Sequence, residues 1–206
     1  MQGVFIVFEG GDGVGKSTQI QMLAKALKRK GYKILLTREP GGTSIGEKLR
    51  LILKREPMCP LAELLIFEAS RAELVETRIL PHLRKGGIVL SDRFQDSSVV
   101  YQGIVRGIGV DRVKLANQLA TSNLTPHRSI LLDPKDKRFS ARLRSRRKTK
   151  DRFEREQNAF HSRVEAAFRK IAKKNPRYRI YQAERPRQEI HNLILRDLEK
   201  LIRARR

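Results

Sequence analysis

The residues best suited to chemistry form one glycine-rich segment, Gly10-Gly11-Asp12-Gly13-Val14-Gly15-Lys16-Ser17-Thr18. A glycine, four residues, a second glycine, a lysine and a hydroxyl residue make the spacing of a phosphate-binding P-loop. Glycines let successive N–H groups point at phosphate oxygens, Lys16 reaches the β- and γ-phosphates, and the Ser17 hydroxyl can bind Mg²⁺. An apolar run precedes the segment and a helical pattern follows it, which is the context that the motif requires. The segment predicts a site for a nucleoside triphosphate.

The P-loop does not decide the reaction, because GTPases, motor ATPases and nucleotide kinases share it. Arg38 and Arg93 stand at the ends of predicted strands beside the loop, where planar, permanently charged guanidinium groups can fix an acceptor phosphate. Asp92 follows an apolar strand, the place where P-loop enzymes put an acid for Mg²⁺. A structural salt bridge from Asp92 to Arg93 or Lys16 is the alternative interpretation.

A predicted helix carries Phe67 and Arg71 four residues apart, so the two side chains share one helix face. One can stack on a pyrimidine while the other hydrogen-bonds the edge of the ring. Taken alone, Phe67 would more often be a core residue and Arg71 a solvated one, and Ser97 can serve as a helix-capping hydroxyl.

Several motifs in one order carry a family resemblance: Glu9 to Gly13, Arg38-Glu39-Pro40-Gly41-Gly42-Thr43, Phe67 to Arg71, Asp92-Arg93-Phe94, Ser97-Ser98 and Tyr101-Gln102-Gly103. The set resembles thymidylate kinase of the bacterial type, from Phe5 to the segment Asp151-Arg152-Phe153-Glu154. The resemblance implies transfer of the γ-phosphoryl group of ATP to dTMP, with Mg²⁺ as cofactor. It implies ATP contacts along Gly10–Thr18, metal ligation by Ser17 and Asp92, and substrate contacts from Asp12, Arg38, Pro40, Phe67, Arg71, Arg93, Ser97, Ser98, Tyr101 and Gln102.

The resemblance also implies individual roles. Phe67 would stack on thymine and Arg71 would bond a carbonyl of the base. Ser98 would lie near the ring nitrogen with Gln102 close by. Tyr101 would crowd the 2′ position of the sugar. Asp12 would lie near the 3′-hydroxyl.

A basic segment at about residues 142–152 is expected to form a short lid. The P-loop contains no arginine, and in this it is similar to the subgroup that carries catalytic arginines in the lid. Arg142, Arg144 and Arg146 match those positions by their spacing from Asp133, and Arg152 follows. With Lys16, Arg38 and Arg93, we therefore expect Arg142, Arg146 and Arg152 to be catalytic. The stretch 147–150 is about one residue longer than usual, which leaves open which arginine reaches the transferred group.

Strands alternating with helices predict one α/β domain over residues 1–206, similar to P-loop nucleoside monophosphate kinases. Five strands would form a parallel sheet with helices on both faces, and ligands would lie beyond the carboxyl ends of the strands. The expected strands are Val4–Phe8, Lys33–Thr37, Ile88–Ser91, Ser129–Asp133 and Tyr178–Gln182. The expected helices are Ser17–Lys30, one from Thr43 or Ser44 to Lys54, Leu61–Arg84, Asp96–Arg106, Asp111–Thr121, Glu154–Lys174 and one after Pro186.

The net charge of the 206-residue chain is +23, and residues 135–206 hold 25 Lys and Arg against 9 Asp and Glu. Such a field attracts polyanions, so a nucleic-acid-dependent P-loop ATPase is the alternative from another class. Another nucleotide or deoxynucleoside kinase is the alternative within the class. Few aromatics accompany the charge, so we expect no specific nucleic-acid binding.

No apolar run approaches the ~20 residues of a membrane span. We expect a cytoplasmic enzyme. The resemblance to thymidylate kinase also implies a homodimer formed through the middle helices, for which Leu61–Arg84 and the segments after Asp96 are the candidates.

Overall fold

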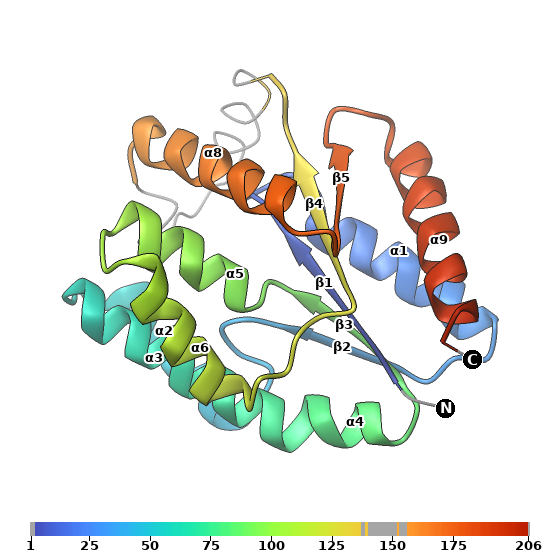
Figure 1. Ribbon diagram of the computed structural model, residues 1–206, viewed down its shortest axis with the longest axis horizontal. Helices are drawn as coiled ribbons and strands as arrows, with labels where there is room; N and C mark the ends of the chain where they lie inside the picture. The colour runs from blue at the N-terminus through green and yellow to red at the C-terminus, as the bar shows by residue number, and fades with distance from the viewer. Residues whose placement is uncertain (1–2, 137–138, 140–151, 153–155, 206) are drawn as a thin grey trace.

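The computed structural model describes residues 3–136, 139, 152 and 156–205. Five parallel strands form one sheet in the order β2-β3-β1-β4-β5, which confirms the predicted fold class. β1 is central, and all six of its residues are buried because helices cover both faces of the sheet (Figure 1). The strands are β1 Val4–Glu9, β2 Ile34–Arg38, β3 Ile88–Asp92, β4 Arg128–Asp133 and β5 Tyr178–Gln182.

Alternating residues of β1 enter two different hydrophobic cores. Ile6 and Phe8 pack with the apolar stripes of α1 (Lys16–Arg29) and α9 (Arg187–Arg203), which lie together on one face of the sheet (Figure 1). Phe5 and Val7 point to the other face and pack with Leu74. This alternation follows from strand geometry, in which successive side chains point to opposite faces of the sheet. Because both faces of β1 are packed, its carboxyl end, where the P-loop begins, is held in place.

Several predicted helices are confirmed with small changes in their bounds. α2 (Ser44–Arg55) begins after Thr43, whose side chain accepts a hydrogen bond from Gly46 N at 2.9 Å. α6 covers Val110–Thr121, and α9 begins directly after Pro186. α8 (Asn158–Lys174) begins later than the predicted Glu154, so that boundary was wrong. The backbone of Gln157 is extended, and Glu156 bonds Arg106 at 2.7 Å instead of entering the helix.

The two middle helices contain wider π-helical turns that the sequence analysis did not predict. α3 (Pro60–Leu74) continues through the π-helix η1 (Val75–Ile79) into α4 (Leu80–Arg84). Pro81 has no N–H to donate to the preceding turn, which explains the change of helix type just before it. α5 (Gln95–Ser98) likewise continues into the π-helix η2 (Val99–Val105), which carries Tyr101 and Gln102.

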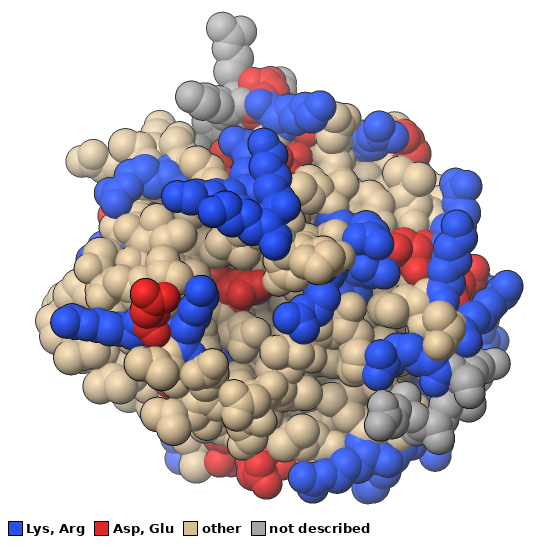
Figure 2. Space-filling view, viewed as in Figure 1, with Lys and Arg blue, Asp and Glu red and all other residues tan. Residues whose placement is uncertain are grey.

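Lys and Arg side chains are spread around the visible face of the molecule and do not gather over one element (Figure 2). Within the described ranges, no helix is long and apolar enough to cross a membrane.

Candidate active site

The P-loop connects β1 to α1 in a conformation that glycine makes possible. Gly10 has a φ of +128°, and a Cβ there would lie 2.6 Å from Leu132 O, so no other residue fits. Gly15 precedes α1 with a φ of +96°. A helix N-terminus placed directly after such a loop offers its free N–H groups to an anion such as a phosphate.

Lys16 is buried at the start of α1, and its ammonium group donates to two carbonyl oxygens of the loop, Gly10 O at 3.1 Å and Gly11 O at 2.7 Å. Burial, together with the nearby Arg93, lowers the pKa of Lys16 to about 8. The carbonyls hold the side chain along the loop on which the phosphates of a nucleotide would rest.

Ser17 and Asp92 lie together, as the predicted metal site requires. The Ser17 hydroxyl donates to Asp92 Oδ2 at 2.8 Å, which joins the first turn of α1 to the end of β3. A hydroxyl and a carboxylate supply the hard oxygen ligands that Mg²⁺ prefers, so this pair fits the ion. No three His, Cys, Asp or Glu side chains form a metal-binding group in the described part of the chain.

Arg93 follows β3 in a strained turn, with a φ of +74° that non-glycine residues rarely adopt. Glu9, fully buried at the end of β1, accepts from Phe94 N at 3.0 Å and from the Ser97 hydroxyl at 2.6 Å. The Arg93 guanidinium donates to Ser97 Oγ at 3.2 Å and to Asp12 Oδ1 at 2.8 Å. Ser97 thus links Glu9 to Arg93 and is not a helix cap.

Burial raises the pKa of Glu9 to about 8, against the opposing effect of Arg93. The pKa of Arg93 is also raised. Burial by itself would lower it, but Tyr101 and the carboxylates of Asp12, Asp92 and Glu9 favour the charged form. The guanidinium of Arg93 also lies 5.3 Å from the centre of the Tyr101 ring.

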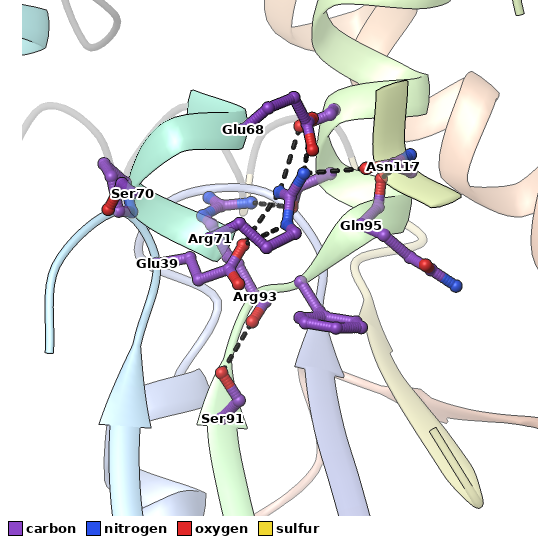
Figure 3. Close-up of polar contacts among 12 residues, drawn as sticks. Glu39, Glu68, Ser70, Arg71, Ser91, Arg93, Gln95 and Asn117 are labelled. Atoms are coloured by element: carbon purple, nitrogen blue, oxygen red, sulfur yellow. Dashed lines mark hydrogen bonds and ion pairs between the residues drawn. The ribbon is translucent and has the colours of Figure 1, made fainter. Parts of the chain in front are cut away.

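Arg71 is the largest fully buried side chain described, which excludes the solvated role that its sequence position alone suggested. It lies between two carboxylates, Glu39 and Glu68 (Figure 3). Its Nε donates to Glu39 at 2.8 Å and its Nη1 to Glu68 at 2.5 Å. Its Nη1 also donates to Asn117 at 2.7 Å and its Nη2 to Ser98 at 3.0 Å. We call Arg71, Glu39, Glu68, Asn117 and Ser98 the Arg71 cluster.

The Arg71 cluster holds two acids against one base. Burial raises the pKa of Glu39 to about 7, although Arg71 opposes the shift. Burial would lower the pKa of Arg71, but Glu39 and Glu68 raise it above its ordinary value. Glu39 Oε1 and Glu68 Oε2 are buried and have no hydrogen-bond partner among the described residues. The cluster is therefore tightly fixed and electrostatically costly to disturb.

One cavity of about 530 Å³ joins the P-loop to the Arg71 cluster. Its size suits a small-molecule site. Arg38, at its mouth, pairs with Glu47 at 3.0 Å and is exposed. The predicted site residues that line the cavity are Asp12, Gly13, Gly15, Lys16, Ser17, Thr18, Arg38, Pro40, Phe67, Arg71, Asp92, Arg93, Ser97, Ser98, Tyr101 and Gln102.

Other predicted residues lie elsewhere. Gly10, Gly11 and Val14 are not among the lining residues: the two glycines hold Lys16, and Val14 packs into the core. Arg152 contacts Glu63 at 2.6 Å and Leu53 O at 3.2 Å, beside the cavity. Arg142, Arg144 and Arg146 lie outside the described residues, as does most of the expected lid.

We predicted no role for the buried acids Glu9, Glu39, Glu63 and Glu68 or for Asn117, although the first two and Glu68 stand in the motifs that carry the resemblance. Three of them carried a local signal: Glu9 ends an otherwise apolar strand, Glu39 follows Arg38, and Glu68 precedes Arg71 by one helical turn. Glu63 and Asn117 had none, because their partners are 39 and 46 residues away.

Comparison with known proteins gives one consistent result. A family model for thymidylate kinase matches residues 8–194. The thymidylate kinase of Caldanaerobacter subterraneus subsp. tengcongensis is 41% identical over 209 residues, covering 99% of each chain. That of Dehalococcoides mccartyi is 44% identical over 206 residues, covering 98% of each. A crystal structure of thymidylate kinase from Ehrlichia chaffeensis superposes with a TM-score of 0.80 at 32% identity, covering 96% of this chain and 100% of that one.

Proposed function

This chain belongs to the thymidylate kinase family and transfers the γ-phosphoryl group of ATP to dTMP in dTTP synthesis, and we propose that the transfer takes place in the cavity described above. One observation carries the assignment of the site: the P-loop and the Arg71 cluster line the same cavity. A donor phosphate on the loop and an acceptor base beside the cluster would then point their reacting groups at each other, which supplies the positioning on which phosphoryl transfer depends.

At the donor end, the P-loop N–H groups and Lys16 would bind the phosphates of ATP. Lys16 would turn from Gly10 O and Gly11 O toward the β- and γ-phosphates, whose negative charge favours its protonated form. Ser17 and Asp92 would hold Mg²⁺, which supplies positive charge that offsets the charge of the phosphates. We also propose that the enzyme acts in the cytoplasm, as its membership of the thymidylate kinase family suggests.

At the acceptor end, Arg38 and Arg93 would hold the phosphate of dTMP near the donor. Arg93 is held in position by its hydrogen bond to the Ser97 hydroxyl, which in turn donates to Glu9. Phe67 would stack on the base, with Arg71, Ser98 and Gln102 at its polar edge. No protein nucleophile or general base is needed, because a phosphate monoester with a second pKa near ~6 is largely dianionic at neutral pH.

The assignment of the substrate is tested by comparing acceptors in steady-state assays with dTMP, dUMP, CMP, GMP and thymidine. We expect the highest kcat/KM for dTMP. A thymidine preference would indicate a deoxynucleoside kinase, which needs a carboxylate base near the 5′-hydroxyl. A clear preference for any acceptor other than dTMP would overturn the assignment.

We also propose that the chain forms a homodimer through α2, α3 and α6, which lie side by side (Figure 1). Seven of the eight large apolar side chains that are exposed in the described chain lie on these three helices: Ile45, Leu51, Ile52, Leu61, Leu65, Leu115 and Leu119. An exposed apolar face of this kind marks an interaction surface. A second copy would cover it with the same helices, as a two-fold interface requires.

Sedimentation tests the dimer. Leu119→Glu should shift the wild-type dimer to a monomer, because a buried unpaired carboxylate opposes association. Ile180→Glu changes an exposed apolar residue on β5, away from the face, and should remain dimeric. A monomeric wild type, or equal effects of the two substitutions, would contradict this interface.

A further inference from the structure

Another of the buried acids, Glu63 of α3, lies next to Gln102, a residue that lines the cavity. It is 1% exposed. Its Oε1 accepts from Gln102 Nε2 at 2.8 Å, and its Oε2 accepts from Arg152 Nη2 at 2.6 Å. Arg106 Nε approaches Oε1 at 3.7 Å. Glu63 therefore connects α3 with η2 and with Arg152, yet it does not itself line the cavity.

The charge on Glu63 determines which way the Gln102 amide can face. An ionised carboxylate only accepts hydrogen bonds, whereas a glutamine amide offers donors at Nε2 and an acceptor at Oε1. The guanidinium groups of Arg152 and Arg106 face the Glu63 carboxylate with positive charge, so the carboxylate can only accept hydrogen bonds. Only Nε2 of Gln102 can satisfy the carboxylate, so the opposite orientation would place two acceptors against each other. The orientation of this amide thus follows from chemistry.

We propose that Glu63 is a positioning residue that sets base specificity, by holding Gln102 so that its Oε1 faces the base as an acceptor. Thymine and uracil carry a hydrogen on N3 and can donate to that oxygen. Cytosine has an unprotonated N3, which is itself an acceptor, and would meet Oε1 with a repulsive contact. The inference rests on the proposed function, since it assigns a selectivity to the acceptor end of the same site.

The burial of the pair makes the selectivity substantial. Gln102 is also 1% exposed and lines the cavity, so little water reaches the amide to compensate a mismatched base. A buried polar group left without a partner costs more than an ordinary hydrogen bond contributes. We expect the mismatch to lower kcat/KM for dCMP relative to dTMP by at least about tenfold.

Glu63→Gln is the decisive variant. It keeps the shape of the side chain but can donate to Gln102 Oε1, so the Gln102 amide can turn its Nε2 toward the base. The ratio of kcat/KM for dTMP to that for dCMP should fall by about tenfold. The ratio of dTMP to dUMP should stay unchanged, because both bases share the N3–H. Both kcat/KM values in a ratio are measured on one enzyme preparation. A lower fraction of folded enzyme reduces both values equally and does not change the ratio.

Two further variants separate orientation from charge. Arg106→Met removes a guanidinium from Glu63 and leaves the bond to Gln102 in place, so the dTMP-to-dCMP ratio should not change. Glu63→Asp keeps the charge facing Arg152 but draws the acceptor away from Gln102, and should lose part of the preference. It also serves as the test if Glu63→Gln does not fold.

A double-mutant cycle with Gln102→Met shows whether Glu63 acts through Gln102. Gln102→Met should itself lose the preference against dCMP, and adding Glu63→Gln should change the ratio no further. A preference retained in Glu63→Gln and Glu63→Asp, or an equal effect of Glu63→Gln in both backgrounds, overturns the inference while leaving the proposed function intact. A wild type that does not phosphorylate dTMP would instead overturn the proposed function.

Discussion

The two ends of the proposed site are constructed differently. The proposed donor end is centred on one continuous segment, Gly10–Thr18, which offers backbone N–H groups and a helix terminus, with Asp92 beside Ser17. The acceptor end is assembled from side chains of separate elements, with buried acids behind it: Glu39 and Glu68 at Arg71, Glu63 at Gln102. The proposed donor end is therefore a loop whose N–H groups are available to a ligand. The side chains of the proposed acceptor end also pair with buried acids and so contribute to the core. Substitutions should consequently affect chemistry at the first and stability at the second.

The largest expected effect is the loss of stability on replacing Arg71. Arg71→Ala leaves Glu39 and Glu68 buried beside each other without their shared cation, and removing one partner of a buried ion pair costs about 3–5 kcal/mol. Urea unfolding monitored by circular dichroism measures the change. Arg185→Ala, which breaks an exposed pair with Glu189, is the control and should change stability by less than about 1 kcal/mol. Similar losses in the two variants would remove the contrast between the ends.

Lys16→Ala should produce the converse result, a loss of turnover without a comparable loss of stability. Removing one preorganised donor from the charge that develops in a transition state lowers kcat by about 10²–10³-fold, and we expect a loss of at least this order for Lys16. The folded protein loses only two bonds to loop carbonyls and is spared the burial of an ammonium group. A coupled assay for ADP measures the rate. Lys28→Ala, on the exposed side of α1, is the control and should retain the wild-type rate. A near-normal rate in Lys16→Ala would contradict the role of the loop.

Glu9, between the two ends, should make stability depend on pH. The folded protein holds its proton up to about pH 8, while the unfolded chain releases it near 4.5. The stabilisation is complete below about pH 4.5 and is lost as the pH rises to about 8. Glu9→Gln lacks this titration, so its free energy of unfolding should rise relative to the wild type across that window, by on the order of a few kcal/mol.

Chemical denaturation of both proteins at about pH 5 and about pH 8 provides the measurement. Glu189→Gln, at an exposed position, is the control and should track the wild type at both values. If the difference between Glu9→Gln and the wild type is the same at both pH values, Glu9 does not retain its proton in the folded protein.

The smallest effect is expected at Phe67, which lines the cavity but lies outside the Arg71 cluster. Phe67→Ala should raise KM for dTMP by about tenfold and leave kcat and stability nearly unchanged, because stacking contributes binding energy that substrate and transition state share. Phe67→Tyr keeps the ring and should behave like the wild type. An unchanged dTMP affinity in Phe67→Ala would remove Phe67 from the base site.

The sequence by itself determined the parts of this protein that depend on short-range patterns. Apolar runs, helical spacing and Gly/Pro breaks predicted five strands in a parallel sheet, because these signals act over a few residues. The P-loop could be recognised for the same reason, since all of its groups are consecutive. Arg38 and Arg93 could be proposed as acceptor residues from their places at strand ends, whereas the proposal for Phe67 and Arg71 needed the family resemblance.

Only the tertiary structure decided what surrounds those residues. Arg71 looked like a solvated helix residue when its position was considered alone, but its partners Glu39 and Asn117 come from a loop and a helix that are 32 and 46 residues away. Glu63 gains its two hydrogen-bond partners, Gln102 and Arg152, only when α3 packs against η2 and Arg152. The start of α8 also depended on a contact, that of Glu156 with Arg106, which local propensity does not contain. Buried charge requires partners from the whole chain, so its arrangement becomes visible only when the chain is folded.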